Sequence, residues 1–370
     1  MRLPTALLAC GLLSTALGQE RQILLQVLPS TVEQLEFLRS DVSSIYEVDF
    51  WSHPQLGEPT FVSVSPAEAA KVEALLKQRQ VDVRVVSDDI TNGGDDPRSI
   101  TLGEYHSHDE INTFLDETAA NFPDIASVQS IGQSFEGRDM KLIKLGVPGE
   151  NKKAVFIDAG IHAREWISTA VAVYFIHAMT TQFETNDRIN DLMRAVDVYV
   201  LPSTNPDGYE YSRSSSGRRL WTKNRRPHGS CVGVDLDKNF PFEFGGQGTS
   251  SNTCSIIYCG PEPASEVEVR NMIAFFQANK EAIKAYIATH SYGQLWLLPC
   301  GYQSPSVYPD DYDDLLDLGK RCVGAILDVH RTRFQAGNAN DLRGSAAGAA
   351  FDYVKSIGIK YAYTVELRPR

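Results

Sequence analysis

The stretch that decides the fold is Ala154-Val155-Phe156-Ile157-Asp158-Ala159-Gly160-Ile161-His162-Ala163-Arg164-Glu165-Trp166. Residues 154–158 form a short apolar run, which is typical of a buried strand, and residues 165–179 show a helix pattern after the turn 159–161. A strand that passes through a tight turn into a helix is the unit of an α/β sheet. His162 and Glu165 therefore lie just past a strand end, where open α/β sheets place their sites.

Strand and helix patterns continue to alternate outward from this stretch. A capping box, Ser107-His108-Asp109-Glu110, opens a helix that runs to about residue 121. The further expected strands are residues 196–202, 285–289, 295–298 and 360–366, and the further expected helices are 265–279 and 312–329. The alternation predicts an α/β domain with a mostly parallel mixed sheet and helices on both of its faces.

A smaller unit precedes this domain. Its expected strands are residues 23–28, 45–51, 60–64 and 81–86, and its expected helices are 32–38 and 66–78. The tract Asn92-Gly93-Gly94-Asp95-Asp96-Pro97-Arg98 then interrupts all periodicity, as linkers do. We therefore expect a small α+β domain over residues 19–98 and a second domain over residues 99–370, with a bond after Arg98 that a trypsin-like protease could cut.

The first 18 residues have the pattern of a secretory signal, with Arg2, an apolar stretch from Leu3 to Leu13 and a small-residue exit before Gln19. We therefore expect a secreted, extracellular protein. The apolar segment 166–183 carries six polar residues and predicts a buried helix rather than a membrane span.

Composition excludes several classes of protein. The 370 residues are 42% apolar, which excludes a disordered or collagen-like chain, and 35 Lys plus Arg against 47 Asp plus Glu give a net charge of −12. An acidic chain argues against nucleic acid or an anionic membrane as partner. The five cysteines that remain after loss of Cys10 include no CxxC unit, which argues against a cysteine-built zinc module.

Four polar residues carry the candidate chemistry. His162 and Glu165 are three residues apart, so both side chains can face one point. His290 ends the strand pattern 285–289, and Glu366 is a lone carboxylate after the apolar strand 361–365. Burying an unpaired carboxylate costs free energy, so a metal or a reacting water is expected near Glu366. Each signal alone is weak, and together they indicate a metal centre.

Taken together, these residues resemble the zinc carboxypeptidases of the carboxypeptidase A type, which are secreted as zymogens. The resemblance extends over nearly the whole chain, from Val48-Asp49-Phe50-Trp51 to the end. Its motifs occur in the family's order as His162-Ala163-Arg164-Glu165-Trp166, Asn205-Pro206-Asp207-Gly208-Tyr209, Cys231-Val232-Gly233-Val234-Asp235, His290-Ser291-Tyr292 and Thr364-Val365-Glu366-Leu367-Arg368.

The resemblance implies one Zn²⁺ per chain, held by His162, Glu165 and His290 with a water in the fourth position. It implies that Glu366 is the general base in hydrolysis of the C-terminal bond of peptides or proteins. It also implies an activation prosegment over residues 19–98 that covers the site, a trypsin-like activating protease, a monomer, and a disulfide between Cys231 and Cys254. The resemblance implies no disulfide partner for Cys259, Cys300 or Cys322.

The substrate side follows the family only in part. Arg164 and Tyr292 match substrate-binding positions, and Phe351 matches the pocket floor, which predicts a preference for apolar C-terminal residues. Thr222 replaces an arginine that polarises the carbonyl, Asp237 and Lys238 replace an Asn-Arg pair that binds the terminal carboxylate, and Gly344 aligns with a mobile tyrosine. The chain also ends four residues after Glu366, so we expect a C-terminally truncated domain.

Three functions remain open at this point. The first is a secreted zinc carboxypeptidase made as a proenzyme, which the zinc ligands and the base favour. The second is a zinc-binding pseudoenzyme or peptide-binding module, which Thr222, Asp237 and the short C-terminus favour. The third is a trypsin-type inhibitor or structural secreted protein with an incidental His-x-x-Glu, and five ordered motifs argue against it.

Overall fold

The computed structural model describes residues 23–38, 42, 48–50, 56–57, 60–87, 100 and 102–368. The expected signal segment 1–18, with Cys10, and the expected linker 92–98 lie outside these residues. The chain divides into two compact units, Met1–Asn92 and Gly93–Arg370. The division falls at the start of the expected linker, and each unit is described by itself.

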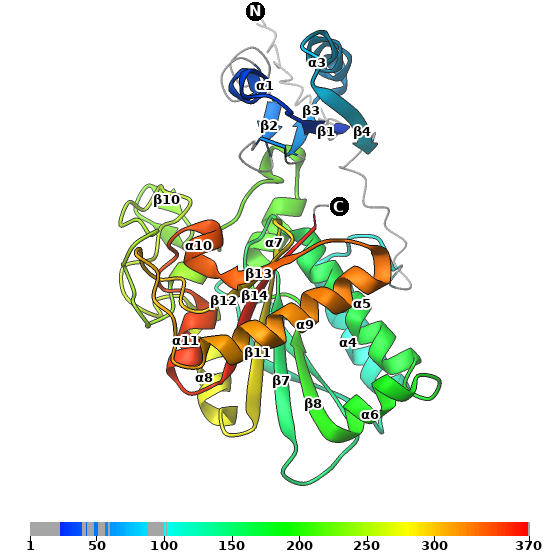
Figure 1. The fold of residues 1–370 in the computed structure, drawn as a ribbon. Coiled ribbons are helices and arrows are strands. Elements are labelled where there is room, and N and C mark those ends of the chain that lie inside the picture. Colours follow the sequence, from blue (N-terminus) through cyan, green and yellow to red (C-terminus); the bar gives the residue numbers. More distant parts are fainter. Residues whose placement is uncertain are drawn as a thin grey trace, which may run out of the picture. The chain divides into compact units, whose positions relative to one another are not determined.

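The first unit is a small α+β domain (Figure 1). Its elements are β1 Ile23–Leu28, α1 Val32–Phe37, β2 Val48–Phe50, β3 Thr60–Val64, α3 Pro66–Gln78 and β4 Asp82–Ser87. The strands pair antiparallel in the order β2-β3-β1-β4. Leu25 and Val27 of β1 pack with Val72 and Leu76 of α3, so the apolar face of the helix covers the sheet.

The second unit contains an eight-stranded mixed sheet in the order β13-β12-β14-β11-β7-β8-β6-β5. The strands are β5 Ala126–Gln133, β6 Asp139–Leu145, β7 Lys153–Ala159, β8 Val196–Leu201, β11 Ile283–Ser291, β12 Leu295–Leu298, β13 Gln335–Asn338 and β14 Tyr361–Leu367. The four pairs β13-β12, β14-β11, β11-β7 and β7-β8 are parallel. The pairs β12-β14, β8-β6 and β6-β5 are antiparallel, which confirms the expected mixed sheet.

Helices cover both faces of this sheet (Figure 1). The helices are α4 His108–Asn121, α5 Trp166–Thr181, α6 Asp187–Ala195, α7 Pro206–Arg213, α8 Val267–Asn279, α9 Tyr312–His330, α10 Ala339–Arg343 and α11 Ala350–Ser356. In β7, Phe156 packs against α8, whereas its neighbours Val155 and Ile157 pack with α5, because successive side chains of a strand point to opposite faces. No helix among the described residues is long and apolar enough to cross a bilayer.

Short loops and one small hairpin complete the second unit. The hairpin consists of β9 Pro227–His228 and β10 Cys231–Val232, and the single 3₁₀ turns are η2 Ser216–Arg218 and η3 Leu236–Lys238. The strands β7, β11 and β14 are parallel neighbours, so their carboxyl ends meet at one edge of the sheet. Their register places Thr289 beside Ala159 and His290 beside Glu366. The sheet therefore brings the ends of three strands, with the candidate residues, to one place.

Candidate functional site

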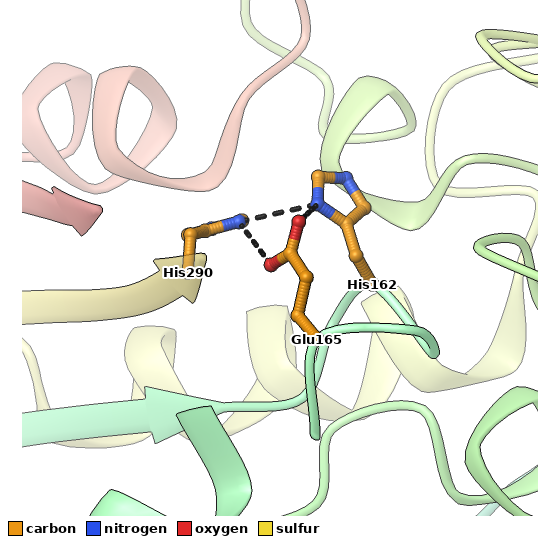
Figure 2. Close-up of side chains that lie close together, drawn as sticks. All are labelled: His162, Glu165 and His290. Carbon is orange, nitrogen blue, oxygen red and sulfur yellow. Dashed lines mark hydrogen bonds and ion pairs between the residues drawn. The ribbon is translucent and has the colours of Figure 1, made fainter. Parts of the chain in front are cut away.

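Three potential metal ligands converge where β7 and β11 end. His162 and Glu165 follow β7 in the turn before α5, and His290 is the penultimate residue of β11 (Figure 2). The Nδ1 atom of His162 is 3.0 Å from Oε1 of Glu165, and Nδ1 of His290 is 3.2 Å from Oε2 of the same carboxylate. The two Nδ1 atoms are 3.2 Å apart. One ion could therefore contact all three side chains.

Asp235 contacts the far side of the His162 ring. Its Oδ1 atom is 3.1 Å from Nε2 of His162. A carboxylate at this distance favours the proton on Nε2, which leaves the lone pair of Nδ1 directed at Glu165 and His290. In the sequence, Asp235 stands out only as part of a motif. A ligating histidine usually has a carboxylate partner, and this is the signal that could have identified Asp235.

The charges of the cluster favour a cation. Burial lowers the pKa of His162, but the negative charges of Glu165 and Asp235 outweigh this effect and raise it to about 10. Burial also opposes ionisation of Glu165, yet the charges of His162 and His290 hold the pKa of its carboxyl far below the ordinary value. The ionised carboxylates of the cluster thus stabilise positive charge, which is a second proton on His162 without a metal ion and would be the ion itself when one is bound.

The donor set fits Zn²⁺. Two imidazole nitrogens and one carboxylate are the ligands of many catalytic zinc sites, which keep a further position open for water or substrate. The ligand atoms of His162, Glu165 and His290 all lie within 4.8 Å of one another. Among the described residues, these three form the group of side chains that could hold a metal ion. The residues present therefore match a catalytic rather than a closed structural zinc site.

Glu366 lies beside this cluster, opposite His290 in the β11-β14 register, and is only 4% exposed. Its Oε1 atom forms an ion pair with Arg343, the last residue of α10, and its Oε2 atom has no hydrogen-bond partner in the part of the chain that is described. Sequence reasoning missed Arg343, because the residue lies in a segment with little resemblance to the family.

The side chains of Asp237 and Lys238 are engaged by the protein itself. Oδ1 of Asp237 accepts a hydrogen bond from the backbone N–H of Ala350, the first residue of α11, at 3.0 Å. Nζ of Lys238 donates to the backbone carbonyl of Asp237 at 3.3 Å and lies 3.9 Å from its Oδ2 atom. Both residues are largely buried. The pair thus ties η3 to α11.

The remaining substrate-side residues are distributed around the cluster. Thr222 is buried, and its backbone carbonyl accepts the N–H of Ala163 at 3.0 Å. Arg164 is exposed, Tyr292 follows β11 directly, and Gly344 follows α10 with a φ of 89°. Position 222 thus lacks the guanidinium that the family resemblance implies there.

Phe351 is buried in α11 and packs against Gly301. A Cβ atom built on Gly301 would lie 2.8 Å from Cζ of the Phe351 ring, so the ring needs a glycine there. Asp352 accepts the N–H of Gly301 through Oδ2 at 2.9 Å and is also buried. Burial raises the pKa of Asp352 to about 7.

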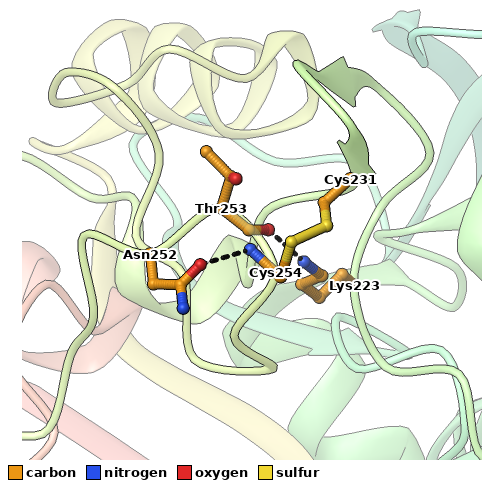
Figure 3. The surroundings of a disulfide bond; sticks show 5 residues. All are labelled: Lys223, Cys231, Asn252, Thr253 and Cys254. Atoms are coloured by element: carbon orange, nitrogen blue, oxygen red, sulfur yellow. Dashed lines mark hydrogen bonds between the residues drawn. A yellow bond between two sulfur atoms is a disulfide. The ribbon is translucent and has the colours of Figure 1, made fainter.

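Cys231 and Cys254 form a disulfide with a Cα to Cα distance of 5.2 Å (Figure 3). Nearby, Nζ of Lys223 donates to the carbonyl of Thr253 at 3.0 Å, and the N–H of Cys254 donates to Oδ1 of Asn252 at 3.0 Å. The bond joins β10 to the loop that follows η3. Cys259, Cys300 and Cys322 are free thiols.

Comparison with known proteins identifies the family. The zinc carboxypeptidase family model matches residues 111–370, and the carboxypeptidase activation peptide model matches residues 25–92. The chain belongs to the zinc carboxypeptidase family.

Relatives of known name include carboxypeptidase B of Astacus astacus, which is 45% identical over 71% of this chain and 86% of its own length. Carboxypeptidase A2 of Mus musculus is 34% identical over 93% of this chain and 85% of its own. The solved structure of thrombin activatable fibrinolysis inhibitor covers 94% of this chain with a TM-score of 0.80 and 31% identity, and this chain covers 91% of it.

Membership in this family establishes the broad activity and the cofactor. The chain is a metallocarboxypeptidase, a peptide hydrolase of a family that uses zinc. It carries an activation peptide and is therefore of the zymogen type. The fold confirms the expected mixed α/β sheet with an N-terminal propeptide region.

Proposed function

We propose that the protein is a secreted zinc-dependent carboxypeptidase that removes apolar residues from the C-termini of peptides or proteins. The observation that carries the proposal is the convergence of His162, Glu165 and His290 within 4.8 Å, beside the buried carboxylate of Glu366. One Zn²⁺ per chain would be held by these three residues.

The residues of the chain divide the chemistry between them. When bound, zinc lowers the pKa of a bound water toward about 7 and polarises a carbonyl. Glu366 accepts the proton of the attacking water and gives it to the leaving amine, as a positioned general base does. Asp235 holds His162 in the tautomer that presents Nδ1.

The proposed preference for apolar residues rests on the surroundings of Phe351. Ala347, Ala350 and Phe351 are buried in the segment that leads into α11. An apolar side chain placed against them would lose contact with water, a gain of about 1.5–3 kcal/mol for full burial. We expect faster hydrolysis of C-terminal Leu or Ala than of C-terminal Arg or Lys.

Activation and location form the second part of the proposal. We propose that a trypsin-like protease cuts after Arg98 and separates a prosegment of residues 19–98 from an enzyme of residues 99–370. An extracellular location is supported by the disulfide between Cys231 and Cys254, since such bonds persist in oxidising compartments. We also propose that the enzyme is a monomer.

A second candidate function is a zinc-binding pseudoenzyme or peptide-binding module. The internal engagement of Asp237 and Lys238 favours it, because neither side chain is then available to bind a terminal carboxylate. Thr222 adds to this, since loss of one oxyanion donor typically lowers the rate by about 10²–10³.

Zinc content and hydrolysis of a blocked dipeptide, measured on the same preparations, test the proposal. The wild type should hold one zinc and hydrolyse a dipeptide ending in Leu after limited trypsin treatment. Glu366→Gln should keep the zinc and lose about 10²–10⁴ of the rate, because the base is gone. Glu150→Gln, at an exposed position, is the control of equal charge change. Full zinc content without hydrolysis would favour the pseudoenzyme.

A further inference from the structure

Arg343 is a cation at the reaction centre that the family motifs do not supply. It is the last residue of α10, and its Nη1 atom forms an ion pair with Oε1 of Glu366. Its side chain is 47% exposed, whereas that of Glu366 is 5% exposed. A guanidinium has five N–H donors, so a single contact through Nη1 leaves most of them for another acceptor.

Charged side chains of the candidate site act on Arg343. Partial desolvation lowers the pKa of Arg343, while the charges of Glu165 and Asp237 raise it and that of Arg164 lowers it. These residues are a zinc ligand, a residue of the altered carboxylate pair and a candidate substrate-binding residue. Arg343 therefore interacts electrostatically with the proposed zinc site and with the altered carboxylate pair.

Of the other cations of this region, two lysines each donate to a backbone carbonyl, and Arg164 is exposed. Lys238 donates to the backbone of Asp237, and Lys223 donates to the carbonyl of Thr253. Position 222 is a threonine, which carries no charge. Arg343 is thus a guanidinium at this edge of the sheet that combines contact with Glu366 and exposure to solvent.

We propose that Arg343 binds the C-terminal carboxylate of the substrate and exchanges Glu366 for that carboxylate when a peptide binds. A guanidinium binds a carboxylate best through two parallel N–H groups, and a single contact to Glu366 is replaced by such a pair. The exchange leaves Glu366 free to accept a proton. This inference rests on the proposed carboxypeptidase function.

Probes that resemble the product allow binding of the carboxylate to be measured separately from catalysis. Binding of L-leucine and L-leucinamide is measured by calorimetry on the full chain, loaded with zinc, before and after limited trypsin treatment. The two probes share a side chain and an amino group and differ in the carboxylate. Loss of a charge-assisted contact corresponds to about 10–100-fold in affinity, so after trypsin the wild type should bind leucine at least about tenfold more tightly than leucinamide.

Two variants then test whether Arg343 causes the preference for leucine. Arg343→Gln should reduce the leucine to leucinamide ratio to below about threefold, and Arg343→Lys should give an intermediate ratio. Arg321→Gln, on the exposed side of α9, removes the same charge and should keep the wild-type ratio. Hydrolysis of a blocked dipeptide by Arg343→Gln should show a raised KM.

The outcomes separate this inference from the proposed function. An unchanged ratio in Arg343→Gln, or no preference for leucine in the wild type, overturns the role of Arg343 even where hydrolysis is rapid. A ratio that depends on Arg343 supports the role, and it does so even where no peptide is hydrolysed and the proposed function fails.

Discussion

We expect Asp235 to affect the proposed metal centre, although it is not one of the three proposed ligands. It contacts Nε2 of His162 at 3.1 Å and so fixes which ring nitrogen faces Glu165 and His290. Asp235→Asn keeps the size of the side chain and removes the charge. We expect zinc affinity to fall about 10–100-fold while the stoichiometry at saturating zinc stays at one.

Competition with a chelator measures this change. Asp191→Asn, at an exposed position of α6, is the matched control and should keep the wild-type affinity. Replacement of a ligand itself, as in His162→Ala or His290→Ala, should abolish stoichiometric zinc, whereas His177→Ala should not. Equal zinc affinity in Asp235→Asn and the wild type would contradict a supporting role for Asp235.

A second prediction at this scale concerns the buried carboxyl of Asp352. Burial raises its pKa from an ordinary value near 3.8 to about 7. A raised pKa means that folding favours the protonated form, so the contribution to stability is complete below about pH 3.8 and is lost as the pH rises through 7. The loss is on the order of 4 kcal/mol by pH 8 as an upper value.

Asp352→Asn should therefore gain stability relative to the wild type as the pH increases, because the amide stays neutral and still accepts the N–H of Gly301. Urea unfolding at pH 4 and at pH 8 gives the difference between the two proteins. The difference should be larger at pH 8, and Asp191→Asn should show no such trend. A difference that is the same at both pH values would refute the burial argument.

At the scale of elements, a glycine allows two segments near the site to pack closely. Gly348 has a φ of 74°, and a Cβ atom there would lie 2.4 Å from the backbone oxygen of Lys238. Gly348→Ala should thus cost at least about 2 kcal/mol of unfolding free energy, through the strained φ and the displaced backbone of η3. Gly324, within α9, has nothing within 4 Å of the same built atom.

Gly324→Ala is the matched control and should gain up to about 1 kcal/mol, since alanine is the better helix former. Urea unfolding at neutral pH measures both variants. Opposite signs are expected, and equal effects would show that the loop containing Gly348 adjusts without strain.

The elements also show how far the sequence determines the site. The pattern that predicts a strand at 154–158 and a helix from 165 corresponds to β7 and α5, where Glu165 is the N-cap. The proposed ligands follow such elements, so their position at the strand ends was predictable. The contact of Asp237 with Ala350 joins residues 113 positions apart, and the contact of Arg343 with Glu366 depends on how α10 is held. No local pattern encodes either contact, and the edge strands β5 and β13 and the inner strand β6 were likewise not predicted.

At the scale of the whole molecule, the chain consists of two units with separate cores. Leu25, Val27 and Val72 belong to the core of the first unit, and Phe156 and Tyr286 belong to the main core of the second. Each sheet has its own covering helices, so each unit buries its apolar surface independently. Proteolysis between the units should therefore leave both cores intact.

The last prediction follows from this separation. Backbone within paired strands and helices is cleaved slowly, because a protease needs local unfolding of the chain. Lys71 and Arg79 lie in or next to α3, and Arg84 is paired in β4, so these basic residues are protected. Arg98 follows the glycine-rich and acidic tract 92–97, which predicts a linker. Trypsin should cut first after Arg98, and Arg98→Gln should slow this first cut at least about tenfold. Mass spectrometry of early time points identifies the site, and early cutting at Lys71, Arg79 or Arg84 as fast as at Arg98 would show that the first unit is not an independently folded domain.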